Sequence, residues 1–140
     1  MTRDGVAIDL SPEGEVLLSE YHLATLSTIA PSGLIHAVAV GFTLSDGVVR
    51  VITSDGSQKV RNVERDGRAT VAQVAGPQWI SIAGHAVVSR DPERVAHAVA
   101  LYAARYRQPR PNPQRVVIEL HPEKVLGSAG LFASSDAPTS

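Results

Sequence analysis

Ten residues near the middle of the chain carry the residue types from which proteins build a phosphate site. Residues 53–62 read TSDGSQKVRN and follow a β-branched stretch at 48–52. A strand, a turn rich in hydroxyls and glycine, and a helix start together direct N–H groups toward one point. Ser57 and Lys59 lie at that helix start, with Arg61 close behind. Only two of the 13 basic residues are lysines, so the position of Lys59 favours a phosphate site.

The same ten residues also fit a simpler interpretation. A Ser/Asp/Gly cluster after a strand commonly forms a turn with a helix N-cap, and Lys59 is then a solvated residue of the first helical turn. The two familiar phosphate-binding patterns, GxxxxGK[ST] and GxGxxG, do not occur in the sequence. Both interpretations stay open on these residues alone.

A second group of charged residues surrounds a proline-rich segment. Four arginines fall within eleven residues: Arg105, Arg107, Arg110 and Arg115. A guanidinium binds a carboxylate through two parallel hydrogen bonds, so the cluster predicts a carboxylate clamp. In the alternative, Arg105 and Arg107 end a helix and complement its dipole, while the other two pair at the surface or at a dimer contact. For Arg107 we favour the helix end.

No catalytic side chain stands out in the sequence. There is no HExxH motif, no recognisable Ser/His/Asp arrangement and no paired-carboxylate motif, so covalent, zinc-protease and glycosidase chemistry all lack residues. The chain has no cysteine, and its five histidines are not spaced as metal ligands. The sequence predicts neither a metal site nor a catalytic acid, base or nucleophile.

Composition bounds the class of protein. A chain of 140 residues is large enough for one domain with a single core. A net charge of −1 argues against a general nucleic-acid binder. No long apolar run follows the polar start, so we expect no signal peptide, no membrane partner and a cytoplasmic location.

Turn residues divide the chain into predicted elements. Expected strands cover 22–30, 34–44, 48–53, 68–75, 79–88 and 115–120, with a short return near 125, and expected helices cover 11–20 and 91–107. Close hairpin signals at 31–33 and 45–47 forbid the crossover helices of a parallel sheet. We therefore predict a mainly β fold, a small closed barrel with flanking helices over residues 11–132. Residues 1–10 are expected to be an N-terminal extension and 133–140 a disordered tail.

With these elements in order, two stretches resemble a known superfamily. His36–Phe42 (HAVAVGF), followed by the residues at 53–62, is similar to the flavin/deazaflavin oxidoreductases that share the split β-barrel of pyridoxamine 5′-phosphate oxidase. The run Tyr102–Glu119, followed by Val125–Ser128, resembles the actinobacterial F420-dependent biliverdin reductases within that superfamily. The resemblance covers about Ser11 to Leu131.

This resemblance implies an oxidoreductase that binds coenzyme F420 at a homodimer interface. Its reaction would be hydride transfer from the reduced deazaflavin to a tetrapyrrole, biliverdin giving bilirubin. The implied coenzyme residues are the ring strand Val38, Ala39 and Val40 with neighbouring His36, the phosphate residues Ser57 and Lys59, and the walls Thr53, Ser54, Gln58, Asn62, Trp79, Ile80 and Ser81. Arg105, Arg110 and Arg115 would bind the substrate's propionates, or else the glutamyl tail of the coenzyme.

Two other functions remain open. FMN is also a phosphate-bearing tricycle, so an FMN-dependent enzyme similar to pyridoxamine phosphate oxidase fits the same residues. A non-catalytic carrier of F420 or a tetrapyrrole also fits, because such a protein needs no acid or base. Turnover separates a carrier from a reductase, and binding of F420 and FMN measured in parallel separates the two coenzymes.

Overall fold

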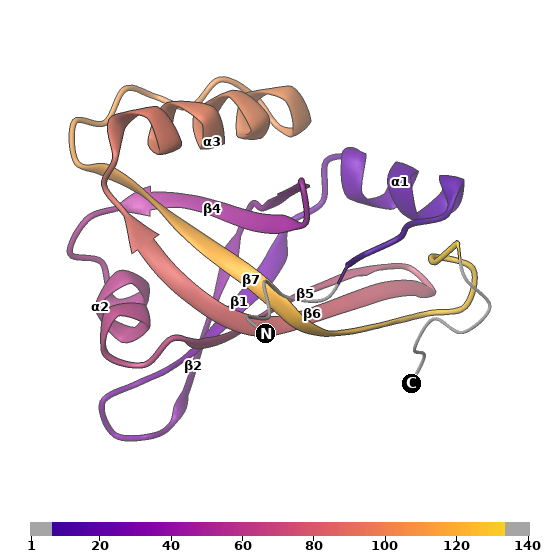
Figure 1. Cartoon of the computed structure of the whole chain (residues 1–140), viewed down its shortest axis with the longest axis horizontal. Helices are drawn as coiled ribbons and strands as arrows, with labels where there is room; N and C mark the ends of the chain where they lie inside the picture. The colour runs from indigo at the N-terminus through magenta and orange to yellow at the C-terminus, as the bar shows by residue number, and fades with distance from the viewer. Residues whose placement is uncertain (1–6, 134–140) are drawn as a thin grey trace.

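A computed structural model describes residues 7–133 as one seven-stranded antiparallel sheet with three helices around it (Figure 1). The helices are α1 (Pro12–Ser19), α2 (Gln58–Arg65) and α3 (Pro92–Arg105). The strands are β1 (Ala24–Ile29), β2 (Ile35–Val40), β3 (Thr43–Ser45), β4 (Val48–Ser54), β5 (Arg68–Ala75), β6 (Gln78–Ser89) and β7 (Arg115–Gly127). The prediction of a mainly β, antiparallel fold is confirmed. Of the tail predicted at 133–140, residues 134–140 lie outside the described residues, and so do residues 1–6 of the predicted N-terminal extension.

The sheet is open, so the closed barrel predicted from the hairpins is wrong. Its strand order is β2-β1-β5-β6-β7-β4-β3, and within residues 7–133 no ladder joins the two edge strands. Strand β3 is three residues long and pairs with only the first part of β4, from Val48 to Arg50. The rest of β4, from Val51 to Ser54, keeps β7 as its only ladder partner in the described chain. This uncovered side of β4 and the free edge of β2 leave a split in the sheet.

The strand predicted over 34–44 is divided into β2 and β3 by tertiary contacts. Phe42 donates its N–H to Tyr106 Oη (3.1 Å), and its carbonyl accepts from Arg105 Nη1 (2.7 Å). Because side chains of the α3 end take both backbone groups, Phe42 cannot continue a ladder. At Gly41 a Cβ atom would lie 2.9 Å from the Tyr102 ring and 3.0 Å from the Tyr106 ring. Only glycine permits this approach of α3 to the end of β2.

Strand β7 is longer than expected because a bulge accommodates its proline. It runs unbroken through Pro122, and the register with β6 shifts between Ala83 and Gly84. A Cβ at Gly84 would lie 2.0 Å from the carbonyl oxygen of His121, so glycine is required there. The bulge absorbs the missing N–H of Pro122. The predicted strand at 115–120 and its return near 125 are therefore one element.

The core lies inside the curved sheet and is closed by the helices. Its largest fully buried side chains include Phe42, Leu26, Ile80, Ile82 and Ile118. Helix α3 packs on β3, β4 and β7, and α2 packs on β1 and β6 (Figure 1). Ile8 and Leu10 also pack against this core, so part of the predicted extension contributes to the domain. No helix in the described chain has the length and apolar character needed to cross a membrane.

Candidate functional site

The split in the sheet opens into a cavity of about 340 Å³. It is bordered by the end of β2 on one side and the end of β4 on the other. Helix α2, helix α3 and the proline-rich segment after α3 complete the walls. The lining residues are Ala39, Val40, Gly41, Ile52, Thr53, Ser54, Lys59, Tyr102, Pro109, Asn112 and Arg115.

The phosphate residues predicted from the sequence come together only in part. Thr53, Ser54 and Lys59 line the cavity, whereas Ser57 and Gln58 are not among its lining residues. Ser57 is the N-cap of α2, but its side chain makes no capping hydrogen bond and lies 3.5 Å from the Thr53 hydroxyl. The predicted strand, turn and helix start are thus present.

Positive charge in the cavity comes from Lys59 and Arg115. Lys59 is partly buried, and loss of water on burial lowers the pKa of its ammonium group. Arg115 is the register partner of Ser54, and its guanidinium donates to the carbonyl of Arg110 (2.7 Å). An anion in the cavity would offset the cost of burying Lys59.

Helix α2 is held in place by one arginine at the junction of β6 and α3. Arg90 donates two hydrogen bonds to Asp55 (2.9 and 2.7 Å) and one to Glu64 (3.0 Å). The hydrogen bond from Arg90 is the main reason that the pKa of Asp55 is lowered. Asp55 precedes α2 and Glu64 lies near its end, so Arg90 ties both ends of the helix that carries Lys59.

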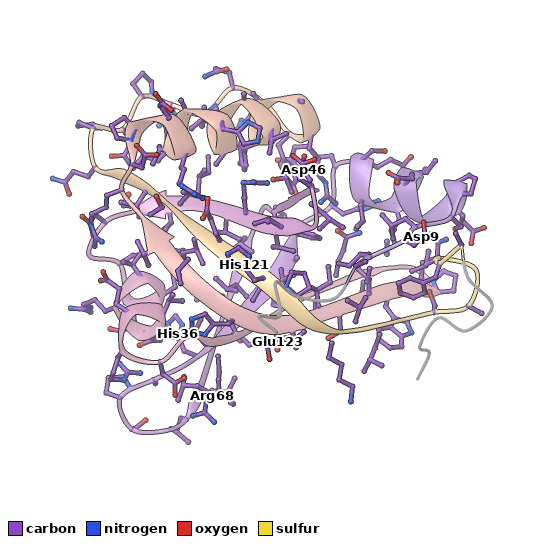
Figure 2. The ribbon with its side chains drawn as sticks, viewed as in Figure 1. Asp9, His36, Asp46, Arg68, His121 and Glu123 are labelled. Atoms are coloured by element: carbon purple, nitrogen blue, oxygen red, sulfur yellow. The ribbon has the colours of Figure 1, made fainter. Side chains whose placement is uncertain are left out.

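The predicted ring strand borders the cavity only at its end. Ala39 and Val40 line it, but Val38 and His36 do not. His36 pairs with Thr28 across the hairpin between β1 and β2, and its position is labelled in Figure 2. Its Nδ1 is buried and finds no hydrogen-bond partner among the described residues. Since β2 is an edge strand of the sheet described by residues 7–133, the outward N–H and C=O groups near Ala39 have no ladder partner there and can form hydrogen bonds to a flat ring.

Asn62 does not face the cavity. It is fully buried, donates to the hydroxyl of Thr28 (3.1 Å) and accepts from Gln58 Nε2 (2.7 Å). Through these bonds Asn62 fastens α2 to β1, and Gln58 supports it.

Arg105 is also committed to the fold. It is 9 % exposed, and its guanidinium donates to the carbonyls of Glu20 (2.9 Å) and Phe42 (2.7 Å) and to Gln73 Oε1 (2.7 Å). With these bonds made inside the protein, the geometry argues against the predicted carboxylate clamp at this position. The alternative weighed from the sequence, a helix-end residue of structural importance, fits better. Arg110 is exposed and lies outside the cavity lining.

The predicted wall at Trp79, Ile80 and Ser81 does not reach this cavity within one chain. These residues pair with the end of β7, with Ile80 opposite Gly127, whereas the cavity lies at the start of β7 around Arg115. Ile80 is 1 % exposed and belongs to the core. A contact of Trp79 or Ser81 with the coenzyme would therefore require a second subunit.

Five lining residues were not predicted as site residues: Gly41, Ile52, Tyr102, Pro109 and Asn112. The Tyr102 ring packs against that of Tyr106, with centroids 4.8 Å apart. Asn112 carried a signal in the sequence, since it lies in the Pro-Asn-Pro stretch of the family resemblance. The other four residues determine the shape of the cavity, and their residue types alone do not indicate a binding site.

Sequence comparison agrees with this architecture. Residues 10–129 match the family described as pyridoxamine 5′-phosphate oxidase. Because the match spans most of the chain, this protein belongs to the pyridoxamine 5′-phosphate oxidase family.

Individual relatives narrow the similarity. The chain is 50 % identical over 125 residues to the F420H(2)-dependent biliverdin reductase of Mycobacterium tuberculosis (strain CDC 1551 / Oshkosh), covering 88 % of this chain and 91 % of that protein. A solved F420 reductase superposes with a TM-score of 0.68 at 25 % identity, covering 82 % of this chain and 98 % of that one. The hypothetical protein Rv2991 of Mycobacterium tuberculosis shares the fold, with a TM-score of 0.73 at 22 % identity over 90 % of this chain and 89 % of that chain.

Proposed function

We propose that this protein is an F420H2-dependent reductase that converts biliverdin to bilirubin. The observation that carries this proposal is the 50 % identity to a biliverdin reductase of that type over 88 % of the chain. The cavity adds independent support, because it combines cationic and hydroxyl donors with a free strand edge.

The donor set fits the coenzyme. Lys59 and the Ser54 hydroxyl can hold the phosphate, and the small side chain of Ala39 lets a flat ring approach the edge of β2. When bound, the reduced deazaflavin supplies the hydride. The residues of the protein bind and orient: Tyr102 and Pro109 cover one side of the cavity and limit water there. No side chain is assigned as proton donor.

We also propose that the working enzyme is a homodimer. A cavity of about 340 Å³ is at the small end for ligand sites and is too small for a coenzyme and a tetrapyrrole together. The outer face of the sheet carries exposed apolar side chains, with Leu23 53 % and Val74 73 % exposed. The register places Val74 opposite Trp79, next to Ser81 on the same face. A second copy docked here would bring Trp79 and Ser81 toward a neighbouring cavity, and Arg110 with Arg115 toward the substrate.

The function is tested by binding and turnover together. We expect F420 to bind more tightly than FMN when both are titrated by fluorescence. We also expect biliverdin to consume reduced F420 in a one-to-one ratio. Tighter binding of FMN would favour the oxidase alternative. Binding of both F420 and biliverdin without consumption would show a carrier.

The dimer is tested at the exposed face. Val74→Asp should convert a dimer into a monomer by light scattering and weaken F420 binding, since it places a charge in the proposed interface. Val87→Asp, at an exposed valine elsewhere on β6, is the matched control and should leave the dimer intact. A wild-type monomer that is fully active at nanomolar concentration would contradict the proposal.

A further inference from the structure

Asn112 has a side-chain orientation that hydrogen bonding determines. Its Oδ1 accepts from the backbone N–H of Gln114 (2.9 Å), a group that can only donate. The opposite end of the amide must therefore be the NH2 group. That group, Nδ2, donates to the hydroxyl oxygen of Ser54 (2.8 Å). The amide cannot be flipped without placing two donors against each other.

This orientation determines what the hydroxyl of Ser54 can do. A serine hydroxyl has one hydrogen to donate and an oxygen that accepts. Because Ser54 Oγ accepts from Asn112, its own hydrogen must seek another acceptor. Within residues 7–133 the side chain of Ser54 makes no other hydrogen bond, and it lies on the wall of the cavity. The hydrogen is thus available to a ligand in the cavity.

The backbone around Asn112 makes this arrangement stiff. Prolines flank it on both sides, and a residue before proline is restricted to extended conformations. The carbonyl of Asn112 accepts from the N–H of Arg115 (3.1 Å), and the carbonyl of Gln114 accepts from the N–H of Asp55 (2.8 Å). One short segment thus positions a hydroxyl from β4 and a guanidinium from β7.

We propose that Asn112 is a positioning residue that makes Ser54 a hydrogen-bond donor to the phosphate of the bound coenzyme. This inference rests on the proposed function. A phosphate presents only acceptor oxygens, so a donor fixed toward it needs no reorientation when the ligand binds. Together with the ammonium of Lys59, the Ser54 hydroxyl forms a seat that favours an acceptor-only anion over a group that carries its own hydrogen.

The test uses two ligands that differ only in the phosphate: the deazaflavin chromophore with its ribityl chain, and the 5′-phosphate of that molecule. Dissociation constants are measured by fluorescence with the full-length protein. If the wild type binds the phosphorylated ligand no more tightly than the other, the cavity is no phosphate site and the proposed function itself is weakened. If the wild type binds the phosphorylated ligand at least tenfold more tightly, the affinities of the variants for the two ligands can be compared.

Asn112→Asp is the decisive variant. An aspartate accepts hydrogen bonds from both the Gln114 N–H and the Ser54 O–H. The Ser54 hydroxyl then donates to residue 112 and presents only its oxygen lone pairs to the ligand. We expect affinity for the phosphorylated ligand to fall more than tenfold and affinity for the phosphate-free ligand to change less than threefold. Equal losses for the two ligands would show a structural role only and would overturn the inference.

A double-mutant cycle separates hydroxyl orientation from the added charge. Asn112→Ala, Ser54→Ala and the double variant add no charge and keep the rest of the cavity. If Asn112 acts through Ser54, its replacement should weaken binding of the phosphorylated ligand threefold or more in wild type and less than 1.5-fold when Ser54 is already alanine. Additive effects would overturn the inference, even if Asn112→Asp fails to fold.

Discussion

The C-terminal end of α3 and the cavity beside α3 differ in how their charged side chains are bonded. At the end of α3, Arg105 makes three hydrogen bonds to protein acceptors and is almost fully buried. At the cavity, Lys59 and Arg115 face open space, and burial lowers the pKa of Lys59. We call the first region the α3 hub, formed by Arg105, Tyr106 and their partners.

The difference teaches that a charged cluster in a sequence can divide between stability and binding. Arg105 and Arg115 lie only ten positions apart, and either type of site suits a guanidinium. In the hub two of the three acceptors are backbone carbonyls, those of Glu20 and Phe42, and the third is the side-chain oxygen of Gln73. In the cavity, the side chain of Lys59 makes no hydrogen bond or ion pair within residues 7–133, so a ligand can supply its acceptor.

The largest expected effect is on folding. Arg105→Met should lower the free energy of unfolding by about 3–5 kcal/mol, because it leaves buried Gln73 Oε1 without its donor and removes one donor each from the carbonyls of Glu20 and Phe42. Denaturant unfolding measures this loss. Arg107→Met, at an exposed residue two positions later, is the control and should change stability by less than about 0.5 kcal/mol. A stable Arg105→Met protein with a raised KM for biliverdin would break the comparison.

The next largest effect is a loss of coenzyme affinity with no loss of stability. Lys59→Ala should weaken F420 binding by about 1.5–3 kcal/mol, since a charge-assisted contact to phosphate is lost. Isothermal titration measures affinity, and thermal unfolding should stay close to wild type. Arg61→Ala, in the same helix and exposed, is the control and should bind almost normally. An unchanged dissociation constant for Lys59→Ala would remove Lys59 from the site.

A smaller effect is expected at the substrate end. Arg115→Lys and Arg110→Lys should raise KM for biliverdin by about 1–2 kcal/mol in free-energy terms, because a point charge cannot reproduce a planar fork. Coenzyme affinity should change less. If these arginines instead hold the glutamyl tail, the loss will appear in coenzyme affinity and shrink for shorter tails. If neither KM for biliverdin nor coenzyme affinity changes, Arg110 and Arg115 are surface residues with no role in binding.

The smallest effect is a pH dependence. Since burial lowers the pKa of Lys59 from its ordinary value of 10.5, its ammonium loses the proton at lower pH than a free lysine does. A bound phosphate favours the charged form. F420 affinity should therefore be full at neutral pH and decline as pH rises through the lowered pKa. In Lys59→Met this decline should vanish, and a decline that persists there would assign it to another group.

Much of the fold follows from the local sequence. Ser11 and Pro12 predict the start of α1, and Ser11 does accept from the N–H of Gly14 (3.1 Å). Turns at 31–33 and 45–47 predict antiparallel hairpins, which the sheet contains. The strand, turn and helix start at 53–62 likewise form as expected, because hydroxyl and glycine chemistry acts over a few residues.

The predictions that were wrong share a physical cause. Whether 34–44 is one strand depends on α3, since side chains sixty residues away take the backbone groups of Phe42. The edge strands β2 and β3 do not pair with each other within residues 7–133, and the contacts of Phe42 separate the end of β2 from the start of β3. Local patterns contain no information on such distant partners.

The sequence by itself determined the family, the antiparallel strands and the placement of Lys59 at a helix start after a strand. Only the tertiary structure decided which polar residues are free. In the folded protein Asn62 and Arg105 are buried and hydrogen-bonded to other residues, whereas Ser54, Lys59 and Arg115 line the cavity. The reason is that a side chain's availability depends on its acceptors and donors in space, and these come from segments far apart in the chain.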